Sequence, residues 1–431
     1  MRRILPCLLL TFGISIAHAQ KDCRNLEYQQ KLLATNPGLA ATYQKIENFT
    51  RTQQSQLMKG TMGADGGNAE GSGAVPAVIT IPVVVHVLYN NSAENISDAQ
   101  IQSEIDEMTQ DYRGQNADRS KAPSYFAGLV ADAGIQFALA KVDPQGYATT
   151  GIIRKYTSIQ YFSYDDRCKS SSIGGDDAWD SDSYLNIWVC NTAGGLLGYS
   201  SLPGGPKAQD GVVINPTVFG TINVGGVFNK GRTAVHEVGH WLNLRHTWGD
   251  AYCGDDGVDD TPTQQAANRG CPSGQLFTCG NTAHGDMYMN YMDFTDDACM
   301  YMFTIGQSQR MRALFAAGGP RNKLLYSTAL TATPLAGTNP ASVQAVAVAA
   351  PAFTVSLYPN PASSFINIKA DESVSLAGKT VSIYNRVGQL LYTGVLQSEQ
   401  QGIDISRWEN GIYFVKINGL ATKAMTKFVK Q

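Results

Sequence analysis

The sequence is poor in long apolar runs, in charge of one sign and in histidine. Beyond the N-terminus, no apolar run of this 431-residue chain is long enough to span a membrane. The formal net charge of −3 leaves no electrostatic footprint for binding nucleic acid. Histidine occurs only six times, and three of the six fall within eleven residues. That concentration directs attention to one short segment.

The segment runs from Thr233 to Asp250 and reads TAVHEVGHWLNLRHTWGD. His236 and His240 are four residues apart, so on a helix they project from the same face. Together with His246 they offer three neutral nitrogen ligands and an open fourth position, which describes a catalytic zinc site. A bound water would have its pKa lowered there, and Glu237 is placed to take its proton. The alternative is a core helix that happens to carry histidines.

The third histidine also restricts the backbone. If the helix continued, His246 would lie too far along the axis to share an ion with His236. The chain must therefore turn after about Leu242. Asn243 occupies the turn position, and asparagine tolerates the left-handed conformation that ends a helix.

A methionine turn at Asn290 to Asp293 follows in the segment MNYMDFTDDACMYMFTIGQSQRM. The spacing HExxHxxxxxH with such a turn resembles the metzincin metalloproteases. The pairing of HEVGHWLNLRH with NYMDF is similar to the pappalysin group, over roughly residues 78–317. This resemblance implies an α/β (α+β) catalytic domain with a mixed sheet, a zinc-binding helix and protein or peptide substrates. Met292 would lie under the metal.

Two positions depart from the family pattern. Asn243 stands in place of the usual glycine but meets the same backbone demand. Phe294 stands where the group has a tyrosine, whose hydroxyl steadies the oxyanion. The loss of one such donor typically costs about 2.7–4 kcal/mol in the barrier. Either another group, such as Tyr291 or Tyr301, replaces it, or the enzyme works without that donor.

The N-terminus predicts export. Residues 1–19 combine Arg2-Arg3, an apolar region and an Ala-His-Ala site, as in a signal peptide. Residues 20–52 are expected to be a pro-segment, in which the Cys23 thiolate would fill the fourth zinc position until removal. The alternative is a free or adventitiously paired cysteine. The resemblance makes Thr50-Arg51 a candidate activation bond.

Six further cysteines fall between residues 168 and 299, an even number that suits disulfides in an exported chain. The family resemblance implies the pairs Cys253–Cys279 and Cys271–Cys299, which leaves Cys168 with Cys190. A structural zinc site at these cysteines is the alternative. The resemblance also implies one or two structural calcium ions in this half. The acidic stretch after Cys253 suggests four calcium ligands: Asp255, Asp256, Asp259 and Thr261. The alternative is a solvated acidic loop that binds no ion.

The catalytic domain is expected over residues 53–330, with strands at 78–89, 134–143, 184–190 and 210–215 and helices at 97–112 and 303–317. Residues 194–205 are expected to form the edge of the substrate cleft, where an extended peptide can pair. Residues 331–352 have the composition of a linker. Residues 353–431 predict an all-β, immunoglobulin-like sandwich. This last segment resembles the sorting domain of the type IX secretion system, with a carbohydrate-binding or adhesive domain as the alternative.

These features predict a secreted or cell-surface zinc endopeptidase, made as a zymogen and exported through the periplasm and outer membrane. A preference for arginine at the cut bond is implied by some relatives, with Asp296 and Asp297 as candidates for the pocket. One rival is a surface-displayed binding protein with a degenerate protease fold. Another is a metalloenzyme of a different reaction type.

Overall fold

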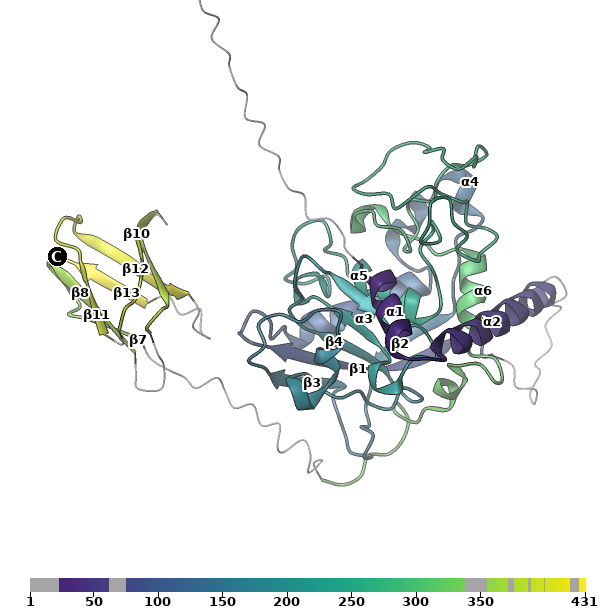
Figure 1. The fold of residues 1–431 in the computed structure, drawn as a ribbon, viewed down its shortest axis with the longest axis horizontal. Coiled ribbons are helices and arrows are strands. Elements are labelled where there is room, and N and C mark those ends of the chain that lie inside the picture. The colour runs from purple at the N-terminus through teal and green to yellow at the C-terminus, as the bar shows by residue number, and fades with distance from the viewer. Residues whose placement is uncertain are drawn as a thin grey trace, which may run out of the picture.

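The structure is a computed structural model that describes residues 23–61, 75–337, 355–370, 376–386, 389–398, 400–418 and 426–431. The expected signal peptide and most of the expected linker lie outside these residues. The described part of the chain consists of a mixed α/β unit and an all-β unit, which confirms the predicted fold class (Figure 1).

A six-stranded mixed sheet forms the centre of the first unit. Its order is β2-β1-β4-β6-β5, and β3 also pairs with β1. All pairings are parallel except that of β5 with β6. The strands have these bounds: β1 Ile79–Tyr89, β2 Ile135–Leu139, β3 Ile152–Tyr156, β4 Leu185–Val189, β5 Gly198–Ser200 and β6 Val212–Ile214. The short strand β5 is the edge.

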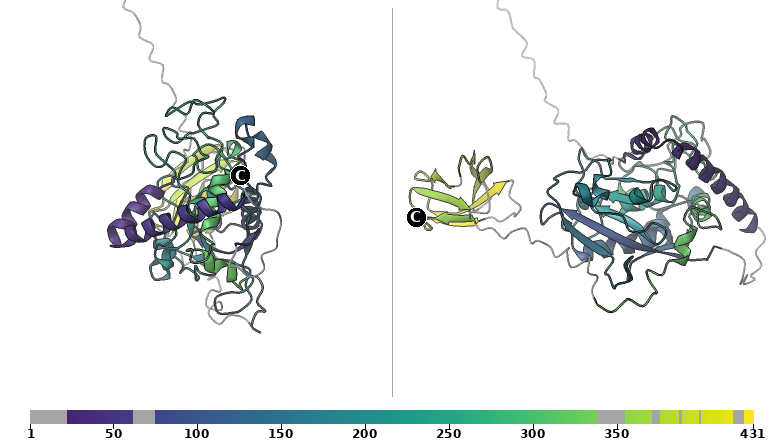
Figure 2. Two further views of the ribbon diagram at one scale, coloured as in Figure 1. Left: turned by 90° about the vertical axis from the view of Figure 1, so that its right-hand side faces the viewer. Right: turned by 60° about the horizontal axis from the view of Figure 1, so that its bottom comes forward.

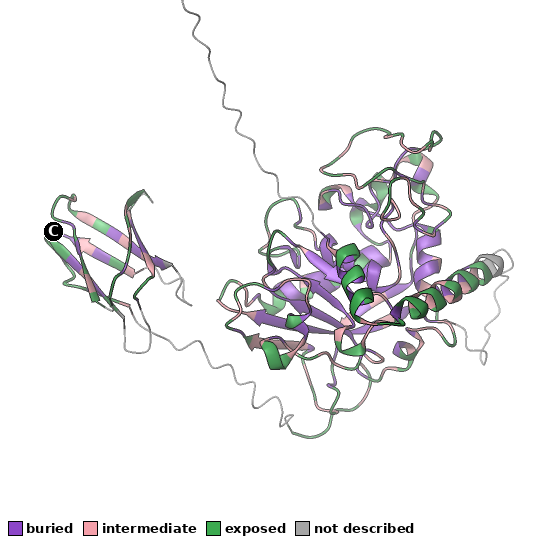
Figure 3. Ribbon diagram, in the orientation of Figure 1, coloured by how far each residue is buried: buried purple, intermediate pink, exposed green. Residues whose placement is uncertain are grey.

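Helices cover one face of this sheet because alternate strand residues carry apolar side chains to it. Val83 and Val85 of β1 share a core with Ile105 of α3 and Val238 of α5. The helices of the unit are α3 Asp98–Tyr112, α4 Ser124–Ala127, α5 Arg232–Trp241 and α6 Ile305–Ala313. Ser97 caps α3 by accepting a hydrogen bond from the Gln100 amide. Strands β1, β4 and β6 and helix α5 are almost wholly buried, as the purple interior in Figure 3 shows.

The N-terminal segment folds as two helices, α1 (Asn25–Thr35) and α2 (Leu39–Thr61), on the outside of this unit (Figure 2). Helix α2 packs on α6. Helix α2 continues through the boundary expected between residues 52 and 53, so no break in the fold marks that boundary. The candidate bond Thr50-Arg51 lies inside this helix, and Thr50 is fully buried.

The second unit is a sandwich of two antiparallel sheets, ordered β10-β9-β12-β13 and β11-β8-β7. Its core is formed by inward-facing residues such as Ile366, Ile383 and Val415. The strands have these bounds: β7 Val355–Tyr358, β8 Phe365–Ala370, β9 Thr380–Asn385, β10 Leu390–Val395, β11 Gln400–Asp404, β12 Gly411–Asn418 and β13 Thr426–Lys430.

Candidate active site

Helix α5 carries the first two histidines, and both of its ends are fixed by specific contacts. At its start, the Asp297 carboxylate accepts hydrogen bonds from the amides of Lys230 (2.8 Å) and Arg232 (3.3 Å). At its end, the helix stops at Trp241 and Asn243 has a φ of 68°. The chain thus turns where the spacing of the histidines predicts, and the turn returns His246 to the other two.

The three imidazoles converge on one point. The Nε2 atom of His240 lies 3.1 Å from Nε2 of His236 and 3.1 Å from Nε2 of His246. Each Nδ1 contacts an acceptor: the carbonyl of Tyr291 for His236 (2.7 Å), that of Leu244 for His240 (2.9 Å), and the Asp250 carboxylate for His246. Because Nδ1 donates these bonds, the Nε2 lone pairs face one another.

This donor set fits zinc. Two nitrogens that lie 2.0–2.1 Å from one ion at the tetrahedral angle are about 3.3 Å apart, close to the 3.1 Å found here. Three buried lone pairs directed at one point repel unless a cation lies between them. Burial opposes ionisation of Asp250, but the hydrogen bond with His246 prevails and lowers the pKa of Asp250. His246 is thereby held in place.

Cys23 completes the group. Its Sγ lies 3.8 Å from Nε2 of His240, and one ligand atom from each of Cys23 and the three histidines lies within 4.8 Å of the others. A sulfur and a nitrogen on one tetrahedral zinc are about 3.6 Å apart. Cys23 also forms a parallel bridge with Gly198 of β5. In the part of the chain that the structure describes, this is the one group of three or more such side chains gathered closely enough for a metal.

Two glycines that were not predicted as part of the site make room for Glu237 and Met292. A Cβ at Gly198 would lie 2.9 Å from Cγ of the buried Glu237. A Cβ at Gly239 would lie 2.5 Å from Sδ of Met292. Gly198 therefore lets the edge strand approach Glu237, and Gly239 lets the methionine turn lie against the zinc helix. The only signal in the sequence was that Gly239 lies between His236 and His240.

Phe294 lies in the site as an aromatic wall. Its ring centroid is 5.5 Å from that of His236 and 4.9 Å from that of His246. Neither candidate for a replacement hydroxyl serves. Tyr291 donates its hydroxyl to Asp111 (2.5 Å), and Tyr301 donates its hydroxyl to the carbonyl of Lys121 (3.2 Å). Both hydroxyls are directed elsewhere, which leaves the other alternative, an enzyme that works without this donor.

The structure contains the disulfides Cys253–Cys279 and Cys271–Cys299, the pairings that the resemblance implied. The pairing of Cys168 with Cys190 is wrong, because both are free and buried. Burial, followed by a hydrogen bond with the Cys168 thiol, raises the pKa of Cys190. The two side chains are neighbours held as thiols.

The acidic stretch does not gather into a cluster of carboxylates. Asp256 and Thr261 meet, since the Thr261 hydroxyl lies 2.8 Å from a carboxylate oxygen of Asp256. Asp255 instead accepts the Gly257 amide and lies 3.9 Å from Arg51, and Asp259 is exposed. The carboxylates of this irregular segment therefore point into different environments, although they are close in sequence. Burial raises the pKa of Asp256 to about 7.

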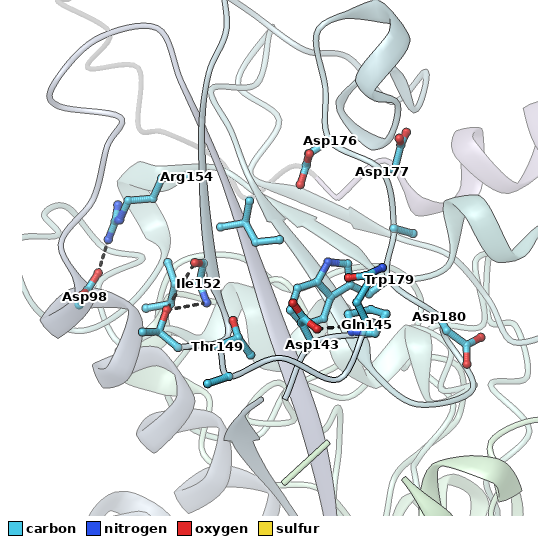
Figure 4. Close-up of a pocket in the computed structure, with 15 residues that line it drawn as sticks. Asp98, Asp143, Gln145, Thr149, Ile152, Arg154, Asp176, Asp177, Trp179 and Asp180 are labelled. Atoms are coloured by element: carbon cyan, nitrogen blue, oxygen red, sulfur yellow. Dashed lines mark hydrogen bonds and ion pairs between the residues drawn. The ribbon is translucent and has the colours of Figure 1, made fainter. Parts of the chain in front are cut away.

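A separate cavity of about 690 Å³ lies beside β3 and the segment 176–180 that precedes β4 (Figure 4). Its wall includes Trp179 and five aspartates but none of the predicted site residues. Its carboxylates have partners within the chain: Asp98 bonds to Arg154, and Asp143 accepts the Gln145 amide. The cavity is therefore distinct from the histidine site.

Comparison with known proteins agrees with this geometry. Residues 168–316 match the family model described as pregnancy-associated plasma protein-A. The chain is 50% identical to mature mirolysin of Tannerella forsythia, solved with a cleaved peptide, covering 60% of this chain and 99% of that one with a TM-score of 0.58. It is 44% identical to a promirolysin variant of the same organism, covering 72% and 98% with a TM-score of 0.61. An extracellular metalloprotease of Pyricularia oryzae is 35% identical over 255 residues, 56% of this chain and 76% of the relative.

Residues 356–431 match the secretion system C-terminal sorting domain, which directs export through the type IX system. Within the described ranges, no helix has the length and apolarity to cross a membrane. The chain is an extracellular metalloprotease. It belongs to the pappalysin family and carries a type IX sorting domain.

Proposed function

We propose that the chain is a zinc endopeptidase made as a latent precursor, with His236, His240 and His246 as metal ligands and Glu237 as general base. The convergence of the three Nε2 atoms at 3.1 Å, each with its Nδ1 committed elsewhere, carries this proposal. A zinc ion held there would supply Lewis acidity towards a water molecule and a substrate carbonyl.

The chain's own residues would do the rest. The Glu237 carboxylate takes a proton from the attacking water and returns it to the leaving amine nitrogen. The edge strand β5 pairs with the backbone of an extended substrate. Met292 supports the helix beneath the histidines. Phe294 excludes water on one side but offers no hydroxyl to the oxyanion, so the barrier is higher than in relatives that have the tyrosine.

Latency follows from the N-terminal segment. Cys23 lies close enough to the three histidines to supply the fourth ligand, and it bridges Gly198. Its thiol would then take the place of water, and the backbone of this segment that of the substrate. The similarity to a promirolysin supports a zymogen. Because Thr50-Arg51 lies within α2, cleavage of that bond requires α2 to detach or unwind first. We therefore keep the pro-segment at residues 20–52, with its end inside α2, and residues 331–352 as the linker.

Expression of the chain from Gln20, with and without Glu237→Ala, tests the proposal. We expect the parent to trim its N-terminus and degrade casein, and the variant to stay full-length and inert while binding one zinc. Glu409→Ala, at an exposed glutamate of the second unit, is the matched control and should behave as the parent. If the parent binds zinc but cleaves nothing, trace trypsin is added to remove the N-terminal segment. If it still cleaves nothing, the proposal of a protease is rejected in favour of a binding protein with a degenerate protease fold.

Calcium and the bond preference stay predictions. The Asp256–Thr261 pair is the remaining candidate for calcium, and chelation with EGTA should lower the melting temperature if an ion binds there. For an arginine pocket, Asp297 is committed to the start of α5, which leaves Asp296. Equal hydrolysis of matched arginine and leucine peptides would exclude the preference.

A further inference from the structure

Tyr28 of α1 is buried among side chains on the face of the sheet opposite the histidines, and the groups around its ring are called the Tyr28 pocket below. Gly198 of β5 faces Glu237, so the next residue, Tyr199, faces the other side of the sheet. There its ring packs on the ring of Tyr28, with centroids 4.8 Å apart. The N-terminal segment therefore holds β5 from both faces, with Cys23 on the metal side and Tyr28 behind the strand.

The polar groups of this pocket match a phenol. Tyr28 is fully buried and donates its hydroxyl to Oδ2 of Asp166 at 2.9 Å. The Tyr28 hydroxyl oxygen in turn accepts a hydrogen bond from Nζ of Lys169 at 3.3 Å. Lys169 also forms an ion pair with Oδ1 of Asp166 at 2.9 Å. The Tyr28 hydroxyl thus donates a hydrogen bond to the Asp166 carboxylate and accepts one from the Lys169 ammonium, which only a group that is both donor and acceptor can do.

Aromatic rings enclose the cation. The Lys169 ammonium lies 5.0 Å from the ring centroid of Tyr199, 5.1 Å from that of Tyr28 and 5.4 Å from that of Trp188. Lys169 is only 3% exposed, and it also donates to the carbonyl of Gln209 at 2.8 Å. All of these groups except Tyr28 belong to the catalytic unit. The pocket therefore keeps its walls and its ion pair when the N-terminal segment leaves.

We propose that Asp166, Lys169, Trp188 and Tyr199 form a binding site for a tyrosine side chain. Tyr28 fills it in the precursor, and a tyrosine of a protein substrate fills it in the processed enzyme. The second half rests on the proposed proteolytic function. Other side chains fit less well. Phenylalanine leaves Oδ2 of Asp166 without the hydroxyl donor that Tyr28 supplies, although Oδ1 keeps its contacts with Lys169 and Tyr199. An acidic side chain would be repelled by Asp166, and a basic one by Lys169.

The first half is tested on the full chain, with Glu237→Ala present to prevent processing. The readout is the rate at which Cys23 reacts with a maleimide, assigned by peptide mass spectrometry. Tyr28→Ala opens the pocket, so labelling should become at least tenfold faster. Added p-cresol should slow it again, whereas toluene, which has the same ring without the hydroxyl, should not. Lys169→Met, combined with Tyr28→Ala, should abolish the effect of p-cresol.

Two further variants keep the test independent of folding. Tyr28→Phe preserves the ring and should label roughly 10- to 100-fold faster than the parent, because a hydrogen bond to a charged group is lost. Tyr43→Phe is the matched control, since its hydroxyl bonds to Gln29 within the same segment, and it should change labelling about threefold at most. Equal protection by p-cresol and toluene, protection by neither, or parent-like labelling of Tyr28→Phe would overturn the proposal.

The second half is tested on the processed enzyme. N-acetyl-tyrosinamide should raise the KM for casein and leave the hydrolysis of a short peptide without tyrosine unchanged. N-acetyl-phenylalaninamide is the control and should raise neither. An unchanged KM for casein overturns the substrate half. A parent that cleaves nothing rejects the proposed function instead, and the labelling experiment still reports on the pocket.

Discussion

The substitution Glu47→Gln should loosen α2 from the catalytic unit. The Glu47 carboxylate accepts hydrogen bonds from Arg310 at 3.1 Å and 2.5 Å and from Arg51 at 2.9 Å. The Arg310 side chain is fully buried, and Glu47 is its ion-pair partner across the contact between α2 and α6. The substitution keeps the shape of the side chain but leaves the guanidinium buried without that charge.

The pKa of Glu47 sets the magnitude. Burial opposes its ionisation, but the hydrogen bond and charge of Arg310 prevail and lower the pKa from 4.5 to about 2. At 1.36 kcal/mol per pKa unit this corresponds to about 3 kcal/mol. Solvent screening at the partly exposed carboxylate, and the Arg51 bond that α2 keeps when it detaches, reduce the value to about 2 kcal/mol. Detachment of α2 should therefore become about 30-fold more frequent at neutral pH.

Hydrogen exchange of the α2 amides measures this detachment. The matched control is Glu27→Gln, which removes an exposed pair with Arg24 and should change exchange little. The pKa is lowered on docking, so the contribution of Glu47 is complete above pH 4.5 and disappears as the pH falls towards 2. The difference between the parent and Glu47→Gln should shrink over the same range. If Glu47→Gln exchanges no faster than Glu27→Gln at pH 7, the reasoning is refuted.

Three further substitutions test the metal site. Asp250→Asn weakens the contact that fixes His246 and should lower zinc affinity about 10- to 100-fold in a chelator competition; an unchanged affinity would contradict this role. Gly239→Ala forces a Cβ against Met292 and should destabilise the chain by about 1–3 kcal/mol, seen as a lower Tm, and a parent-like Tm would show that the turn can move away. Phe294→Tyr adds a hydroxyl beside the histidines and should raise kcat with little change in KM, whereas an unchanged kcat would show that the barrier does not depend on this donor.

Local chemistry made the histidine segment predictable. The spacing of His236 and His240 gives a common helix face, and the position of His246 demands a turn that Asn243 is suited to make. Cys23 lies 217 residues from His240, yet a lone thiol before a zinc motif has an evident use. In each case the residue type carries the signal, and no long-range packing has to be known.

Packing decided what the sequence could not reveal. Helix α2 continues past residue 52 and packs on α6. This long-range contact leaves no mark in the local sequence. Gly198 and Gly239 act through the side chain that they lack, so the only signal in the sequence was the position of Gly239 between the two histidines. Nothing in the sequence around Tyr28 indicates that its ring packs on Tyr199 of β5. Conversely, the carboxylates at residues 255–259 are close in sequence but not in space, so composition alone suggested a cluster that the backbone disperses.

The bridge between Cys23 and Gly198 also bears on the solubility of the chain. β5 is a sheet edge, and the outward backbone groups of a bare edge are a template for pairing with other chains and for aggregation. In the precursor the N-terminal segment lies on this edge, so the chain is protected during export and folding. Removal of the segment exposes the strand to peptides and to other copies of the enzyme alike. The processed form should therefore tolerate a lower concentration before it self-associates than the precursor does.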